Sequence, residues 1–102
     1  MNHEIQTLLK KVFGDLNYEK LILFGSRARG DFSEGSDYDI LIIVQKRLGI
    51  KEKMRLSARL RRELAKKGID ADIILKSNDE IDYYKDKIGS VVRNALKEGV
   101  AL

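Results

Sequence analysis

Two acidic residues, Asp37 and Asp39, stand at the start of an apolar run that ends at Val44. Residues two apart on a strand point to the same face, so the two carboxylates project together from Cα atoms about 6 to 7 Å apart. Carboxylates held this close repel each other and have raised pKa values unless a cation lies between them. Mg²⁺ suits such a pair because it prefers oxygen ligands and completes its coordination shell with water and substrate phosphate. The pair therefore predicts half of a magnesium site that acts on a phosphate.

The turn before this pair could bind the phosphate. Gly25 lets the backbone approach a ligand closely, and Ser26 offers a hydroxyl and an amide at the start of a helical turn. Arg29 could balance phosphate charge or form an ion pair with a nearby acid such as Asp31, and the sequence favours neither role. For Arg27 we favour the ion pair. The P-loop pattern Gly-x-x-x-x-Gly-Lys-Ser/Thr is absent from the sequence, so the predicted phosphate site is of another type.

A third acid could come from the segment GIDADIILKS, in which Asp70 and Asp72 share a face. If this strand lies beside the strand that carries the first pair, either of the two acids could join that pair. We favour Asp72, because the apolar run that follows it repeats the pattern after Asp39. Three carboxylates around one or two divalent ions, with a hydroxyl nucleophile in reach, suit in-line phosphoryl or nucleotidyl transfer.

The elements that must position these residues follow from apolar spacing and turn signals. The first half is expected to contain a helix over 5–13 ended by Gly14, a strand over 21–24, a helical turn over 26–30 and a strand over 38–44. The second half is expected to contain a helix over 51–67 ended by Gly68, a strand over 70–75, and a last helix. A capping box at 77–80 begins this last helix, and Gly99 ends it. The first two strands are joined too closely for a long helical crossover. We therefore expect an α/β (α+β) fold, with a small mixed sheet of three or more strands and helices packed on it.

The two later helices have predicted inward faces. In the helix over 51–67 this face comprises Met54, Leu56, Ala58, Leu60, Leu64 and Ala65. In the last helix it comprises Ile81, Tyr84, Ile88, Val91, Val92, Ala95 and Leu96. The basic residues opposite the first of these faces are interpreted as a solvated surface, which we favour over an RNA or acidic-partner site.

Composition narrows the classes of protein and site. The 102 residues predict one domain over 1–102, and the absence of cysteine leaves oxygen atoms or the single His3 as metal ligands, with His3 disfavoured near a chain end. A net charge of +4, from 20 basic and 16 acidic residues, allows an anionic ligand without requiring nucleic acid. No apolar run approaches the roughly 20 residues of a membrane helix, and the first residues are typical of an amphipathic helix rather than a signal peptide. We therefore expect a cytoplasmic protein without a membrane partner.

The stretch GSRARGDFSEGSDYDILI resembles the nucleotidyltransferase superfamily that includes DNA polymerase β, and most closely its minimal nucleotidyltransferase branch. The signature of that branch is Gly-Ser, about ten residues, then Asp-x-Asp, and here ten residues, 27–36, separate Ser26 from Asp37. The resemblance implies the nucleotidyltransferase fold, ATP as substrate and pyrophosphate as the leaving group. It implies nucleotide binding by Gly25, Ser26, Arg29 and Ser36, and catalysis with Mg²⁺ binding by Asp37, Asp39 and Asp72.

The resemblance also implies a partner. Minimal members commonly pair with a small all-helical HEPN toxin, and the nucleotidyltransferase acts as the antitoxin by adenylylating a toxin tyrosine. Two alternatives stay open: a non-catalytic antitoxin or binding module that acts by steric contact, and nucleotidyl transfer to a small molecule or an RNA end. A homo- or hetero-oligomer is compatible with either reading.

Overall fold

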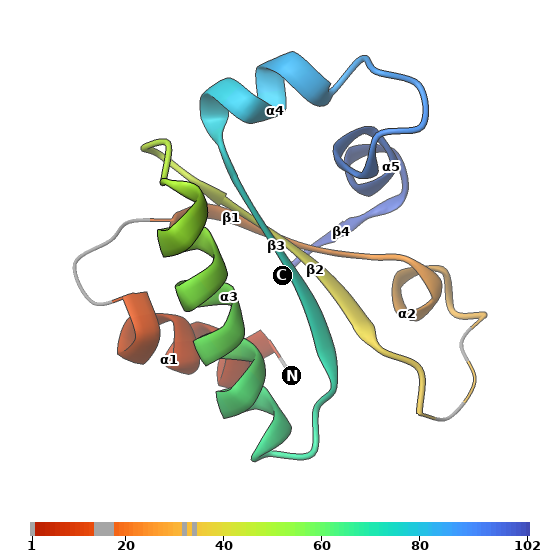
Figure 1. The fold of residues 1–102 in the computed structure, drawn as a ribbon. Helices are drawn as coiled ribbons and strands as arrows, with labels where there is room; N and C mark the ends of the chain where they lie inside the picture. Colours follow the sequence, from red (N-terminus) through yellow and green to blue (C-terminus); the bar gives the residue numbers. More distant parts are fainter. Residues whose placement is uncertain (1, 14–17, 32, 34) are drawn as a thin grey trace.

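A mixed four-stranded sheet forms the centre of the computed structural model, which describes residues 2–13, 18–31, 33 and 35–102 (Figure 1). Its strand order is β3-β2-β1-β4. The antiparallel pairs are β1 (Tyr18–Phe24) with β2 (Tyr38–Val44) and β1 with β4 (Val100–Ala101), whereas β2 and β3 (Ala71–Ser77) run parallel. The expectation of a mixed sheet is therefore confirmed. The first strand begins three residues earlier than predicted, and the two-residue β4 was not predicted.

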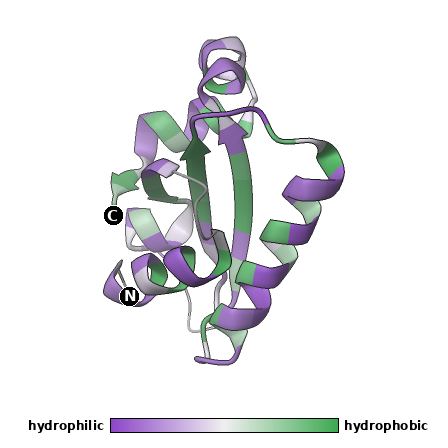
Figure 2. Cartoon of the chain, turned by 90° about the vertical axis from the view of Figure 1, so that its left-hand side faces the viewer, coloured by the Kyte–Doolittle hydropathy of each residue, from purple (hydrophilic) through white to green (hydrophobic). Residues whose placement is uncertain are grey.

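Helices α1 (Asn2–Phe13) and α3 (Ile50–Ala65) cover one face of the sheet. Alternate residues of β2 divide between the two faces, so that Ile40 and Ile42 pack with these helices while Leu41 packs with the opposite helix layer. In Figure 2 the central strands are green over much of their length, whereas the helices alternate between green and purple. Residues 40–44 of β2 are all buried, which confirms that the strand is covered on both faces, as its unbroken apolar run predicts.

The prediction of one continuous last helix is wrong. The segment forms α4 (Asn78–Tyr84) and α5 (Val91–Glu98), separated by a turn that contains Gly89 with φ of 83°. The hydroxyl of Ser90 ends one helix and begins the next, since it donates to the Tyr84 carbonyl at 2.8 Å and accepts from the Arg93 N–H at 3.0 Å. Local capping therefore overrides a helical apolar pattern that spans the turn. The capping box at the start of α4 is confirmed.

The break between α4 and α5 leaves part of the predicted inward face outside the core. Ile88 is 88% exposed because it lies in the turn, and Tyr84, Val91 and Leu96 are also exposed. Val92 and Ala95 of α5 are buried as expected. A helix of only 8 residues contacts the sheet along a narrow stripe, so apolar residues beside that stripe stay in solvent.

Helix α3 likewise buries a narrower stripe than predicted. Leu56, Leu60 and Leu64 are buried, whereas Met54 is 67% exposed and Ala65 is also exposed. The buried residues recur every four positions, which is the spacing of a single ridge packed on the sheet. The predicted end of α1 at Gly14 lies outside the described residues.

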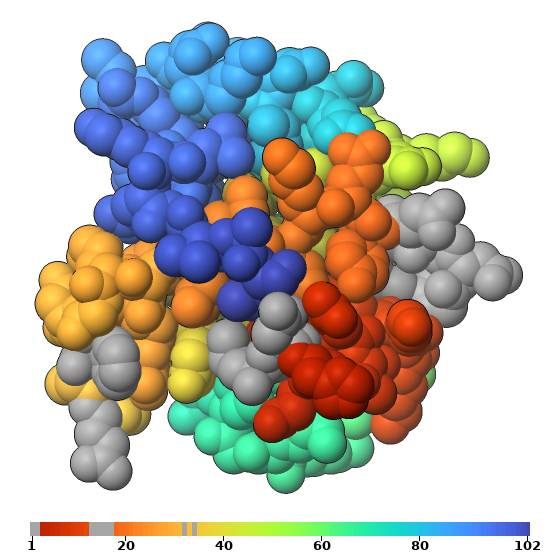
Figure 3. All heavy atoms as spheres, turned by 180° about the vertical axis from the view of Figure 1, so that it is seen from behind, coloured from red at the N-terminus to blue at the C-terminus, as the bar shows by residue number. Residues whose placement is uncertain are grey.

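The C-terminal helix lies over the second face of the sheet, next to the short helix α2 (Ser26–Arg29) that follows β1. Figure 3 shows the blue C-terminal segment beside the gold segment after β1, and crossing the orange strand. The end of α5 and the turn after β1 therefore meet, although they are far apart in the sequence. Among the helices that the structure describes, none has the length and apolar character needed to cross a membrane.

Candidate functional site

Asp39 and Asp72 lie side by side on neighbouring strands, on the face of the sheet that α5 covers. Asp39 of β2 is the register partner of Asp72 of β3, and Asp37 precedes β2 by one residue. Leu41, two residues after Asp39, packs with Ala95 of α5, so by strand alternation Asp39 points to the same face. The register therefore places Asp72, rather than Asp70, directly beside Asp39.

The surroundings of Asp39 oppose its negative charge. Its pKa is raised, first by burial and then by the charges of Asp72 and Asp37, while Arg29 acts in the opposite direction. Among the described residues, the Asp39 carboxylate has no hydrogen-bond or ion-pair partner. Such a carboxylate is electrostatically suited to a cation, which would remove the repulsion between the acids.

The acids suit magnesium by their charge, but they do not form a complete coordination shell. Over the described ranges, no group of three or more His, Cys, Asp or Glu side chains is gathered closely enough to hold a metal ion. The acids nevertheless offer only oxygen donors, and Mg²⁺ needs just one or two protein carboxylates when phosphate and water supply the rest. Metal binding by Asp37, Asp39 and Asp72 thus stays a prediction. The oxygen donors of these side chains suit Mg²⁺.

Gly25 joins the turn to the acids. Its φ of 74° and ψ of −159° belong to a region that only glycine adopts readily. A Cβ built at Gly25 would collide with the carboxylate of Asp39. The carbonyl of Gly25 accepts from the N–H groups of Ala28 at 3.1 Å and Arg29 at 3.0 Å, which begins α2. A glycine is therefore required here both for the backbone conformation and for the closeness of the turn to the acids.

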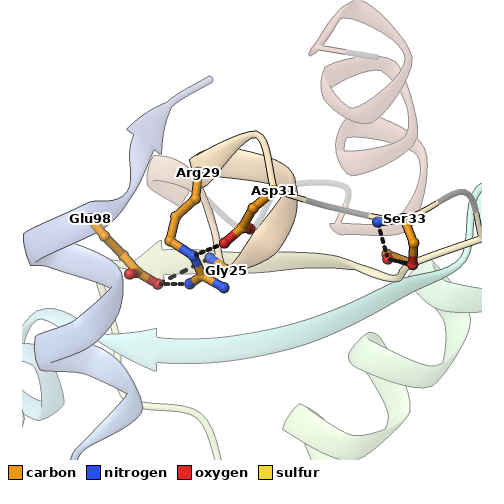
Figure 4. Close-up of polar contacts among 6 residues, drawn as sticks. Gly25, Arg29, Asp31, Ser33 and Glu98 are labelled. Atoms are coloured by element: carbon orange, nitrogen blue, oxygen red, sulfur yellow. Dashed lines mark hydrogen bonds and ion pairs between the residues drawn. The ribbon is translucent and has the colours of Figure 1, made fainter.

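Glu98, the last residue of α5, enters this turn (Figure 4). Its Oε1 accepts from the backbone N–H of Gly25 at 3.3 Å and from Nη1 of Arg29 at 3.1 Å. Arg29 also donates from Nε to Asp31 at 3.2 Å, and its pKa is raised chiefly by Asp31 and also by Glu98. Of the two roles that the sequence left open for Arg29, the ion pair with Asp31 is present, and Glu98 is a second partner that sequence reasoning missed. No local signal marks Glu98, which lies 73 residues after Gly25.

Arg27 and Ser36 contact each other and neighbouring residues. Arg27 donates from Nε and Nη2 to the Ser36 carbonyl at 3.2 and 3.1 Å, and its guanidinium stacks on the Tyr38 ring at 4.4 Å. The Ser36 hydroxyl accepts from the Ser33 N–H at 3.2 Å. These contacts, to a carbonyl and an aromatic ring, give Arg27 a structural role, and the ion pair that the sequence favours stays a prediction. Nucleotide binding by Ser36, Gly25, Ser26 and Arg29 stays a prediction.

Comparisons with known proteins find relatives of this chain in sequence and in fold. The family model described as "Polymerase beta, Nucleotidyltransferase" matches residues 4–101. Two proteins of Methanocaldococcus jannaschii, both named as predicted protein adenylyltransferases, are similar in sequence. MJ0604 is 39% identical over 82% of this chain and 77% of its own length, and MJ0141 is 43% identical over 52% of this chain. The match to MJ0141 spans only about half of that relative, 48% of its length.

Solved structures share the fold. A predicted nucleotidyltransferase from Sulfolobus solfataricus superposes with a TM-score of 0.65 at 27% identity, over 99% of this chain and 78% of that one. A toxin-antitoxin complex with AMP-PNP gives 0.63 at 20% identity, over 97% and 69% of the two chains. A complex of tri-AMPylated HEPN toxin with MNT antitoxin from Shewanella oneidensis gives 0.54 at 19% identity, over 97% and 66%. The last two likenesses concern the fold alone.

Proposed function

Because the chain belongs to the polymerase β nucleotidyltransferase family and is a nucleotidyltransferase, we propose that it transfers AMP from ATP to a hydroxyl group in a Mg²⁺-dependent reaction. The observation that carries this proposal is the meeting of a glycine-serine turn with acids from two strands. A Cβ on Gly25 would collide with the carboxylate of Asp39, and Asp72 is the register partner of Asp39. A phosphate held by the turn would thus lie beside carboxylates that can hold its counter-ion.

Each group has a role in the proposed reaction. The hydroxyl oxygen of the acceptor attacks the α-phosphorus of ATP, the bond from that phosphorus to the pyrophosphate oxygen breaks, and the hydroxyl proton passes to the Asp72 carboxylate. When bound, Mg²⁺ would neutralise the phosphate charge and orient the leaving pyrophosphate. Asp37 and Asp39 would hold the metal, while the turn at Gly25 and Ser26, with Arg29, would orient the triphosphate.

The acceptor we propose is a tyrosine of a small helical HEPN toxin, with this chain as the antitoxin. The sequence relatives named as protein adenylyltransferases support a protein acceptor. The toxin-antitoxin complexes among the solved structures support a HEPN partner and a nucleotide substrate, since one contains AMP-PNP and another an AMPylated toxin.

Asp39→Asn tests the catalytic site. It should reduce transfer of labelled AMP from ATP to the cognate HEPN protein by about 100-fold or more, because a group that holds the phosphate-activating cation contributes several kcal/mol to the transition state. Asp70→Asn is the matched control: it removes a carboxylate two residues from Asp72 and should keep most of the activity. Mass spectrometry of both chains identifies the modified residue.

The same assay separates the steps of the proposal. Removal of divalent cations with a chelator should stop transfer, and added Mg²⁺ should restore it. Full activity of Asp39→Asn would contradict the catalytic mechanism. Transfer to no HEPN residue, with inhibition of the toxin by the unmodified complex, would instead favour an antitoxin that acts by steric contact.

A further inference from the structure

We propose that the Glu98 carboxylate occupies the position of a nucleotide phosphate oxygen and competes with the triphosphate for the turn after β1. This inference rests on the proposed function, because it assumes that the turn binds nucleotide phosphate. It adds a residue from α5 that regulates how tightly the phosphate is bound. In Figure 4 the side chain of Glu98 reaches from the end of α5 to Gly25 and Arg29.

The contacts of Glu98 are those that a phosphate oxygen would make. Oε1 accepts from a backbone N–H of Gly25 at 3.3 Å and from the guanidinium of Arg29 at 3.1 Å. Backbone N–H groups of a glycine turn and an arginine guanidinium are the usual donors to phosphate in proteins. Oε1 of Glu98 thus accepts from both the Gly25 N–H and Nη1 of Arg29. A phosphate oxygen cannot accept the same two hydrogen bonds while Glu98 does.

The carboxylate also has the wrong charge to share the site with a triphosphate. It lies close enough to the acid cluster to add to the charge that raises the pKa of Asp39. A bound triphosphate would bring further negative charge next to Glu98, and like charges at short range repel. The side chain must therefore leave when the phosphate arrives, unless a cation lies between them.

The structure allows this movement without a change in the fold. The Glu98 side chain is 33% exposed, so it can rotate into solvent. The backbone beside it is held in place, since Gly99 donates to the Ala95 carbonyl at 2.8 Å and a Cβ on Gly99 would collide with Ile22. Displacement is thus a rotation of the side chain on a fixed helix end. When the product leaves, the carboxylate can take back the two donors.

The competition predicts the direction of a mutational effect. Glu98→Ala should lower the dissociation constant of a non-hydrolysable ATP analogue with Mg²⁺ by about two- to tenfold, the range expected when a partly exposed ion pair no longer competes. Glu98→Gln keeps an acceptor without the charge and should have a smaller effect in the same direction. Asp31→Asn is the matched control: it removes the other acid on Arg29 but leaves the Gly25 N–H occupied, so it should change binding least.

Two probes distinguish competition from a structural role. Inorganic tripolyphosphate should bind Glu98→Ala more tightly in the same proportion as the ATP analogue, because the effect lies at the phosphate. Adenosine should bind wild type and variant alike. In the transfer assay, KM for ATP should fall in Glu98→Ala while kcat does not rise with it.

The results that would overturn the inference are distinct from those that would overturn the proposed function. If wild type binds the ATP analogue and Glu98→Ala binds it equally or more weakly, Glu98 orients Arg29 for the nucleotide and the competition is wrong. If neither protein binds the analogue or tripolyphosphate, the nucleotide site is wrong and the inference fails with it. Thermal unfolding of each variant confirms that the compared proteins are folded.

Discussion

Asp39 and Glu80 are acids at opposite ends of the parallel strands β2 and β3, and their surroundings differ. Oε1 of Glu80 accepts from the N–H and hydroxyl of Ser77 at 3.1 and 3.2 Å, and its Oε2 lies 2.5 Å from Nζ of Lys53. Burial opposes the charge of Glu80, but the bonds from Lys53 and Ser77 outweigh it and lower the pKa. Asp39 lies among other acids, and its pKa is raised.

The difference is between an acid whose charge is paired and one whose charge is opposed by its surroundings. The ion pairs of Glu80 with Lys53 and Lys76 stabilise its charged form, so its charge is balanced inside the chain. Among the described residues, none forms an ion pair with Asp39 and only the charge of Arg29 opposes the repulsion from the other acids, so a bound cation would stabilise its charged form. Substitutions at the two ends of the sheet can show whether they differ in this way.

The largest effect on stability is expected at Gly25. Gly25→Ala forces a Cβ into the Asp39 carboxylate at a φ of 74°, and should lower the free energy of unfolding by about 2 to 4 kcal/mol. Gly30→Ala is the matched control: φ is 84° but nothing lies within 4 Å of the new Cβ, so only about 1 to 2 kcal/mol of backbone strain is expected. Urea unfolding measures both. An equal decrease in the free energy of unfolding of both variants would show that the Asp39 carboxylate does not obstruct a Cβ at Gly25.

At the structural end, Glu80→Ala should lower the free energy of unfolding by about 1 to 3 kcal/mol, because it breaks a capping box and leaves Lys53 without its closest partner. Glu52→Ala, which removes an exposed acid of α3, is the control and should change little. Thermal or urea unfolding gives both values. If Glu80→Ala left the free energy of unfolding unchanged, the contrast between Glu80 and Asp39 would be wrong.

The smallest effect is a pH dependence of opposite sign at the two acids. Glu80 has a lowered pKa when folded, so its contribution is complete above the unfolded value of about 4.3 and is lost as the pH falls through the folded pKa. Asp39 has a raised pKa, so its charge destabilises the fold once the pH rises from the unfolded value of about 3.9 through the folded pKa. Without divalent cations, Glu80→Gln should therefore lose stability relative to wild type as the pH rises, and Asp39→Asn should gain it.

The measurement is urea unfolding of wild type and both variants at a series of pH values from about 3 to 7. Parallel profiles for the two variants would show that the acids are equivalent. Added Mg²⁺ and ATP analogue should reduce the gain of Asp39→Asn over wild type, since the bound cation stabilises the charged form of the wild-type acid.

Local patterns predicted much of the fold. The unbroken apolar run after Asp39 indicated a strand covered on both faces, and the Ser77 capping box indicated the start of a helix, because both depend on residues close together in the chain. The division between α4 and α5 was missed because the apolar spacing continues across Gly89 and Ser90. The short β4 was missed because two residues have no periodicity of their own.

The sequence by itself determined the chemistry of the candidate site: the types and spacing of Gly25, Ser26, Asp37 and Asp39 are a local signature, and side-chain alternation on a strand follows from the backbone alone. Only the tertiary structure decided which distant residues meet them. The register of β2 with β3 placed Asp72 beside Asp39, and the packing of α5 brought Glu98 to Gly25 and Arg29. Strand pairing and helix packing join residues far apart in the chain, and no local spacing records those contacts.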